Sequence, residues 1–452
     1  MNDIKFKKTN GGLGRQAASE DPVSGLLVYM PNLSYSALVN SANAKIFDII
    51  SLPDGTAVYA AKFRYPEEMA DCGIVMQPMD TASLNAIPSV SDTLISARSS
   101  MNTLHYHISE FFRMNPEGTL YVGVVVDLDG TSVNADQVDA LQRYANGSIR
   151  QMGIINPTAT AATTANINTL LTSLQTGATA LEGRHMPLSL LYATGGKNCT
   201  FSKDGNNDWK PAYTAVASLQ KSKLASTTDA DKLIVSGRCN VSFVACCDVD
   251  PQVIENLGHY AYYGCIGAAL GAVSAAAVNE CIAWVGKFPV SLTKPGLISG
   301  EGLSEVSDAD QDKINSNRYI FVRTYVGDSN NYFNDSFTLD VETSDYSYIE
   351  NVRTIDKACR GVYKNLLPWL NSPILVDARS GKMDSGFVSF LETTAGAALE
   401  DMEKAGELSG YKAEVDPEQN VLATSMVEVV IRNVPTGTMR KVNVKIGFVT
   451  SI

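Results

Sequence analysis

The feature that most constrains the fold is a continuous apolar run, Leu120–Val126, that opens a series of alternating strand-like and helix-like segments. A strand that is apolar on both faces is typical of a parallel sheet covered by helices on both sides. Further strand patterns lie at 149–155, 188–192 and 241–246, and helix patterns at 135–144, 165–175 and 213–221. This alternation predicts a central α/β region built from βαβ units.

An uncharged stretch from Tyr260 to Asn279 raises the question of a membrane span. It is rich in Ala and Gly, including Gly267 and Gly271, whereas membrane spans are usually rich in Leu, Ile and Phe. We therefore expect a helix whose small residues let it pack closely across the central sheet. The first eight residues carry charges with no apolar segment behind them, so we expect no secretory signal.

The last third of the chain has a different pattern from the middle. Long helical segments are expected at 349–370 and 387–404, and strands at 318–326, 426–432 and 441–449. The fold class expected is therefore mixed, with a central βαβ-type α/β sheet region and a C-terminal α+β region in a multi-domain chain that carries extended N- and C-terminal arms. The segments are an arm at 1–25, an additional domain of unassigned fold at 26–115, the central α/β region at 116–294, a polar linker at 295–317, the α+β core at 318–440 and a strand arm at 441–452.

Charge and composition exclude several classes of function. The chain has 452 residues, 36 basic and 48 acidic side chains and a net charge of −12. Nucleic-acid binding needs clustered Lys and Arg, and an anionic membrane surface would repel this chain, so neither partner is expected. The eight cysteines include no C-x-x-C pair and several lie in apolar runs, which predicts buried free thiols.

One motif suggests an enzyme. Asp127 and Asp129 follow the apolar strand directly and resemble the first motif of haloacid-dehalogenase-like phosphatases, in which the first Asp would be the nucleophile. The acidic metal motif of that family matches Gly327 and Asp328, but Tyr332 stands where its second Asp belongs. A strand-to-helix turn explains Asp127 and Asp129 equally well.

No other motif predicts a metal or a cofactor. Asp308, Asp310 and Asp312 have the spacing of a calcium loop, but Lys313 replaces its glycine and Tyr319 its final glutamate. We therefore expect a solvated acidic segment there. The four histidines form no metal-binding or hydrolase motif.

Five segments of the last third run in the order seen in contractile tail sheath proteins. They are Arg318–Tyr325, Asn334–Thr338, Asp345–Asp356, Leu366–Pro373 and Tyr411–Val421. The stretch from Arg318 to Ile452 thus resembles this family, and is most similar to the phage-type sheaths of Bacteroides-like and Mu-like tails. Residues before 120 match nothing that we recognise.

The resemblance implies a structural protein, with no catalytic, cofactor or metal site. Such a subunit polymerises as stacked hexameric rings around a tail tube and contracts to drive the tube through a target envelope, with no nucleotide hydrolysed. The partners implied are further copies of the chain, the tail tube protein, and baseplate and tail terminator proteins. The location implied is a virion tail or injection particle assembled in the bacterial cytoplasm. The alternatives are a phosphatase using Asp127 and Asp129, and a non-contractile capsid or tube component.

Both ends of the chain have alternating patterns that suit strand exchange between subunits. In the last strand the apolar residues alternate with Lys441, Asn443 and Lys445, and an unpaired strand edge is a hazard unless a partner covers it. Donation to a neighbour's sheet would provide that cover through backbone hydrogen bonds. The residues expected to exchange are Ile4, Phe6, Val442, Val444, Ile446 and Phe448. An ordinary hairpin within one chain is the alternative for the C-terminal strand.

Three charged residues on the expected 349–370 helix form a second candidate contact. Arg353, Asp356 and Arg360 have spacings of three and four residues, which places them on one helix face. A solvated ion-pair face is the simpler expectation, and a contact between subunits is the alternative.

Overall fold

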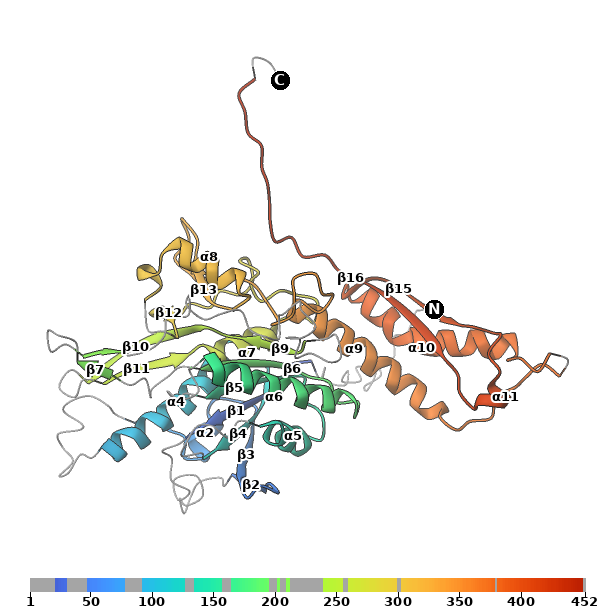
Figure 1. Ribbon diagram of the computed structural model, residues 1–452, viewed down its shortest axis with the longest axis horizontal. Coiled ribbons are helices and arrows are strands. Elements are labelled where there is room, and N and C mark those ends of the chain that lie inside the picture. Colours follow the sequence, from blue (N-terminus) through green and yellow to red (C-terminus); the bar gives the residue numbers. More distant parts are fainter. Residues whose placement is uncertain are drawn as a thin grey trace, which may run out of the picture.

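The structure of the protein is a computed structural model (Figure 1). The residues that it describes are 21–30, 47–77, 92–126, 134–156, 164–194, 201–203, 209–211, 239–254, 259–298, 302–378 and 380–449.

A seven-stranded mixed sheet forms the centre of the molecule, in the order β2-β3-β4-β1-β5-β6-β9. From β4 to β9 all neighbours are parallel, while β3 runs antiparallel to β4 and β2 antiparallel to β3. The strands are β1 (Val23–Tyr29), β2 (Asp48–Ser51), β3 (Ala57–Phe63), β4 (Thr119–Val125), β5 (Gln151–Asn156), β6 (Ser189–Thr194) and β9 (Val241–Phe243). The predicted central parallel sheet is confirmed.

Helices cover both faces of this sheet, which explains why its strands are continuously apolar. α5 (Ala135–Tyr144) packs with α6 (Thr164–Glu182), and α4 (Asp92–Met114) packs with α7 (Ile266–Ala275). The neighbouring residues Leu26 and Leu27 of β1 point to opposite faces and are both fully buried. Leu26 shares its neighbourhood with α7 and Leu27 with α5, so the two helix pairs lie on opposite sides.

The α4–α7 contact is unusually close, as the small residues of the 260–279 stretch predicted, although the helix is shorter than expected because His259–Gly264 form the strand β11. A Cβ atom added to Gly267 would lie 2.4 Å from the backbone oxygen of His107, and one added to Gly271 would lie 2.7 Å from that of Phe111. The absence of a Cβ at these two positions is therefore what allows the two helices to touch. Within the described residues, no helix is long and apolar enough to cross a membrane.

The predicted boundaries need correction at three places. β1, β2 and β3 belong to the same sheet as β4 to β6, so residues 26–115 do not form a separate domain, and β1 already begins inside the predicted 1–25 arm. A local sequence pattern does not show which strands pair, so it could not place these three in the sheet of β4. The remaining described elements near this sheet are α2 (Glu68–Asp71), β7 (Phe201–Lys203) and β8 (Trp209–Pro211).

The predicted linker at 295–317 is also wrong, because it contains regular structure. β12 (Pro295–Leu297) completes a second sheet with β10 (Cys246–Ile254) and β11 (His259–Gly264), and η4 (Leu303–Glu305) follows. The acidic segment forms α8 (Asp308–Ser316), which Ser307 caps by accepting a hydrogen bond from the Asp310 amide. Its acidic first turn therefore stabilises a helix end.

The C-terminal elements project from one end of the body (Figure 1). β13 (Val322–Thr324) and β14 (Asn331–Phe333) form a short ribbon beside the central sheet. The projection itself packs α9 (Ile349–Leu366) against α10 (Ser385–Lys404), and α10 against a hairpin of β15 (Leu408–Val415) and β16 (Val429–Pro435). η5 (Leu367–Trp369) and α11 (Val421–Thr424) complete it. The expected fold class, mixed α/β and α+β with several sheets, is confirmed.

The predicted buried thiols are confirmed for the described cysteines, with one exception. Six of them are buried, and Cys359 on α9 is exposed. Cys199 lies outside the described residues.

Substitution of Gly267 tests the close helix contact. Gly267→Ala should destabilise the protein by about 1–3 kcal/mol, because backbone atoms of α4 cannot rotate away from the new methyl group. Gly410→Ala on β15 is the control, since a Cβ there meets nothing within 4 Å. Urea unfolding of both variants measures the difference, and equal stability would contradict the account.

Acid sensitivity is expected from His107 on α4. Its side chain is fully buried, neither ring nitrogen has a hydrogen-bond partner among the described residues, and burial lowers its pKa to about 3. The neutral form is therefore favoured by the fold, and this contribution is lost as pH falls from about 6.5 toward 3. At pH 5 the loss relative to pH 7.5 should be about 2 kcal/mol. His107→Leu should remove this part of the pH dependence of unfolding, and an unchanged pH profile would contradict it.

Candidate assembly site at the C-terminal tail

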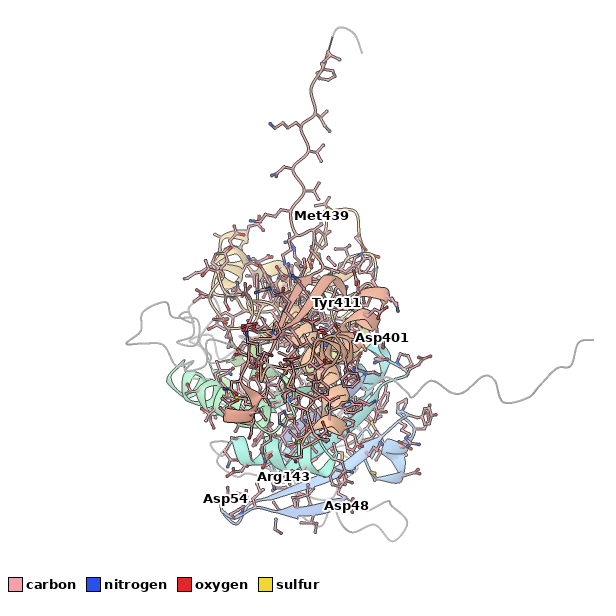
Figure 2. The ribbon with its side chains drawn as sticks, turned by 90° about the vertical axis from the view of Figure 1, so that its right-hand side faces the viewer. Asp48, Asp54, Arg143, Asp401, Tyr411 and Met439 are labelled. Atoms are coloured by element: carbon pink, nitrogen blue, oxygen red, sulfur yellow. The ribbon has the colours of Figure 1, made fainter. Side chains whose placement is uncertain are left out.

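Residues 436–449, here called the C-terminal tail, run as an extended chain away from the body (Figures 1 and 2). Within the described residues they belong to no sheet. Val442, Val444, Ile446 and Phe448 have exposed fractions of 65%, 71%, 93% and 109%. Four alternating apolar side chains in solvent are costly to leave exposed, at about 2 kcal/mol each.

The alternative of a hairpin formed by 426–432 and 441–449 is wrong. β16, which contains most of the first segment, pairs instead with β15 over its whole length, from Leu408–Pro435 to Val415–Val429. The chain turns away after Pro435, so the last strand pattern finds no partner in its own subunit.

The β15–β16 hairpin is itself an incomplete sheet. It contains only two strands, and its buried side chains, such as Leu408 and Val415, face the apolar residues of α10. Both outer edges of this hairpin therefore lack a neighbouring strand among the described residues. A hairpin packed on a helix with two open edges is suited to accept further strands.

The root of the tail is fixed, in contrast to its outer part. The Asn279 side-chain amide donates to the Thr436 hydroxyl at 3.0 Å. Four residues later, Nε of Arg440 donates to both carboxylate oxygens of Asp335, at 3.0 and 3.2 Å, and its guanidinium also pairs with Glu350. The same group stacks on Tyr348, 3.5 Å from the ring centre. We call Arg440, Asp335, Glu350 and Tyr348 the arginine clamp.

Electrostatics supports a charged clamp. Burial works against the charge on Arg440, but Glu350 and Asp335 hold its pKa above the ordinary value. Burial raises the pKa of Glu350, although Arg440 and the hydroxyl of Ser336 act in the opposite direction. A buried carboxylate of this kind stays charged only while its cationic partner is in place.

The charged residues predicted as a solvated face of the 349–370 helix lie elsewhere than expected. Arg353 and Asp356 are buried, so the solvated face is wrong for them, and neither is accessible for a contact between subunits. Arg353 donates to the backbone oxygens of Ala276 and Ala277, both at 3.1 Å. It therefore caps the carboxyl end of α7, where a cation is favoured.

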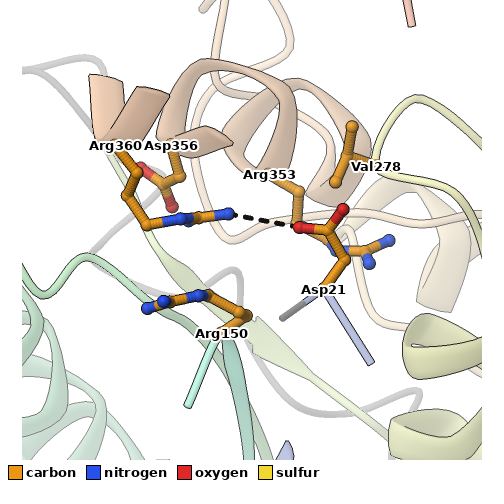
Figure 3. Close-up of a pocket in the computed structure, with 6 residues that line it drawn as sticks. All are labelled: Asp21, Arg150, Val278, Arg353, Asp356 and Arg360. Carbon is orange, nitrogen blue, oxygen red and sulfur yellow. Dashed lines mark hydrogen bonds and ion pairs between the residues drawn. The ribbon is translucent and has the colours of Figure 1, made fainter. Parts of the chain in front are cut away.

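Arg360 binds Asp21 instead (Figure 3), and its helix neighbour Lys357 also pairs with Asp21. Burial alone would raise the pKa of Asp21, but the hydrogen bond and charge of Lys357 and the charge of Arg360 hold it below its ordinary value. Lys357 also pairs with Glu407 at 2.6 Å. A cavity of about 10 Å³ lies in this cluster, lined by Asp21, Arg150, Val278, Arg353, Asp356 and Arg360. That volume has room for one water molecule at most, so it is no site for a larger ligand.

The residues of the phosphatase hypothesis gain no support. Asp127 and Asp129 lie outside the described residues. Ile4 and Phe6, the N-terminal residues expected to exchange between subunits, also lie outside them. Asp328 serves a turn, accepting hydrogen bonds from the Asn330 amide at 2.9 Å and the Tyr332 hydroxyl at 2.8 Å. Within the part of the chain that the structure describes, no cluster of three or more His, Cys, Asp or Glu could hold a metal ion.

Comparison with known proteins places the chain in a family. Residues 78–337 match the N-terminal domain of DUF2586, and residues 345–452 match the C-terminal domain of DUF2586. The chain therefore belongs to the DUF2586 family. No curated protein matches it significantly.

Two solved structures share the fold along nearly the whole chain. A chain in the helical sheath of the anti-feeding prophage in its contracted state has a TM-score of 0.56 and 14% identity, with 98% of this chain and 99% of that chain covered. A chain in the six-fold symmetrised baseplate of the same particle has a TM-score of 0.54 and 14% identity, with 99% and 98% covered. The predicted resemblance to contractile tail sheath proteins is thus confirmed at the level of the fold, and it extends to residues before 120.

The arginine clamp was not predicted from the sequence. Asp335, Tyr348 and Glu350 all lie in segments that carry the sheath resemblance, but Arg440 is distant from them in the chain. The one signal is a cation directly before the alternating strand pattern, and because Lys441 follows it, the position looks like an ordinary solvated one.

The cap that Arg353 forms on α7 can be tested by removal of its charge. Arg353→Met should cost about 2–3 kcal/mol, because two buried carbonyl oxygens lose a charged donor. Arg432→Met is the control, since Arg432 makes an exposed pair with Glu414 that is worth less than about 1 kcal/mol. Chemical unfolding measures both, and equal losses would contradict the capping role.

Proposed function

We propose that this protein is a structural subunit of a contractile tail sheath, which polymerises around a tail tube through exchange of terminal strands. The observation that carries the proposal is the exposed, alternating C-terminal tail beside a two-stranded sheet with open edges. The tail of one subunit can supply the edge strand that the β15–β16 hairpin of another subunit lacks. The fold shared with the contracted sheath and the baseplate of the anti-feeding prophage supports this function.

The dimensions of the two elements are compatible. Residues 441–449 would span about 30 Å as a strand, enough to run beside the seven residues of β16. Added at the edge of the hairpin, the tail can direct Val442, Val444, Ile446 and Phe448 toward the α10 side. Lys441, Asn443 and Lys445 would then face solvent. Burial of four apolar side chains, at about 2 kcal/mol each, would provide the main driving force.

This arrangement produces a polymer and not a closed dimer. The donor surface and the acceptor surface are different parts of the subunit, and such head-to-tail contacts generate rings or helices. We propose stacked hexameric rings, with contraction as a move from a metastable lattice to a better packed one while the strands stay linked. The N-terminal residues Ile4 and Phe6 are proposed to exchange in the same way.

The partners follow from this role. They are further copies of the chain, the tail tube protein, and the baseplate and tail terminator proteins at the two ends. The particle is a phage tail or an injection system, assembled in the bacterial cytoplasm and acting outside the cell. The net charge of −12 argues against nucleic acid as a partner. No catalytic activity and no cofactor belong to the proposal.

Removal of the tail tests strand exchange. A chain that ends at Arg440 should fold with an unchanged melting temperature, because the described residues beyond it are exposed and join no sheet. It should form no tubes or sleeves in negative-stain electron microscopy, whereas the full chain does. A matched control keeps the tail and replaces Lys441 and Lys445 with Gln, which leaves the apolar residues in place. Tubes formed by the truncated chain would contradict the exchanged strand.

The same preparations separate the sheath from the phosphatase alternative. The full chain should show no turnover of a generic phosphomonoester with magnesium, and Asp127→Asn should assemble like the wild type. Soluble monomers whose turnover is abolished by Asp127→Asn would contradict the sheath proposal.

A further inference from the structure

The C-terminal tail is bound to the body at its start, whereas its outer part is exposed to solvent. Thr436 and Arg440 are both bound to the body, through Asn279 and through the arginine clamp. From Val442 onward the apolar side chains are exposed. The last described hydrogen bonds and ion pairs between the tail and the body are therefore those of Arg440, one residue before the alternating strand pattern begins.

The contacts of Arg440 define a direction as well as a position. Glu350 lies in the first turn of α9, Tyr348 is the residue that precedes that helix, and Asp335 follows β14. A planar guanidinium that pairs with two carboxylates and stacks on a ring has one orientation, unlike a single flexible ion pair. Arg318 lies 5.4 Å from the centre of the same Tyr348 ring, which supports the ring in its place.

We propose that Arg440 is a positioning residue, whose clamp fixes the point and the direction from which the C-terminal tail leaves its subunit. The clamp itself is a property of the single subunit, and only its effect on assembly rests on the proposed function. A tail with a fixed root reaches its acceptor at lower cost, since fewer backbone conformations are lost on pairing.

Apart from the clamp contacts, Arg440 takes no part in the apolar packing of the body. Its neighbour Met439 is exposed, and neither residue belongs to an apolar core cluster. Loss of the clamp should therefore release the tail and leave the apolar core of the body intact, at the cost of leaving the buried Glu350 without its cationic partner.

Limited trypsin digestion of the monomeric fraction tests the clamp, because the rate of cleavage after Arg440 reports how often Arg440 leaves its partners. Trypsin must take the arginine side chain into its specificity pocket, so Arg440 has to leave Glu350 and Asp335 before the bond to Lys441 is cut. We expect cleavage after Arg440 to be at least about tenfold slower than cleavage after Lys445, as the loss of one charged hydrogen bond would require. Glu350→Gln should speed cleavage after Arg440 and leave cleavage after Lys445 unchanged. Equal rates at both sites in the wild type would overturn the proposal.

Assembly of three variants tests the consequence. Arg440→Gln should stay folded but melt at a lower temperature than the wild type, because the buried Glu350 loses its cationic partner, and it should form few or irregular tubes. Arg440→Lys, which keeps the charge without the planar fork, should restore assembly in part. Arg432→Gln, on the exposed face of β16, should assemble normally. Regular tubes of wild-type dimensions from Arg440→Gln would overturn the role in assembly. A wild-type chain that forms no tubes would instead contradict the proposed function, and the digestion result would still decide the clamp.

Discussion

The structure depends on the contact between Arg353 of α9 and the carboxyl end of α7. α7 covers the central sheet, and α9 is the first long helix of the C-terminal projection. A buried guanidinium with two carbonyl partners is a specific joint, because its desolvation is repaid only in this geometry. The α10 helix packs on α9, the β15–β16 hairpin packs on α10, and the joint is shared with a second contact, in which Val278, just beyond α7, packs against Leu399, Met402 and Leu408.

The sequence predicted the central sheet well and its limits poorly. Leu120–Val126 and the other apolar runs are unmistakable, because strands buried on both faces consist mainly of apolar residues. Nothing local in the sequence shows that β1 inserts between β4 and β5. Strand order depends on contacts between residues far apart in the chain. The segment at 295–317 is predicted as a linker but contains a helix. Acidic residues are typical both of linkers and of helix N-termini, so this pattern does not separate the two.

The candidate site divides in the same way. Alternation places Val442, Val444, Ile446 and Phe448 on one face of a strand pattern, and this pattern is intrinsic to the chain. That the pattern stays unpaired within the subunit depends on where β16 finds its partner, which only the fold decides. The spacing of Arg353, Asp356 and Arg360 placed them on one helix, but not the partners that bury two of them.

One consequence concerns α9 as a mechanical element. Its first turn holds Arg440 through Glu350, and its later turns hold Asp21 through Lys357 and Arg360. These attachment points are about 10–15 Å apart on a rod that does not stretch. Tension on the chain beyond either attachment is thus delivered to the same rigid rod, and Arg353 passes it to the carboxyl end of α7. Because α9 is rigid and is held at both attachments, a pull on one end of the polypeptide moves the whole subunit and not only the segment that is pulled.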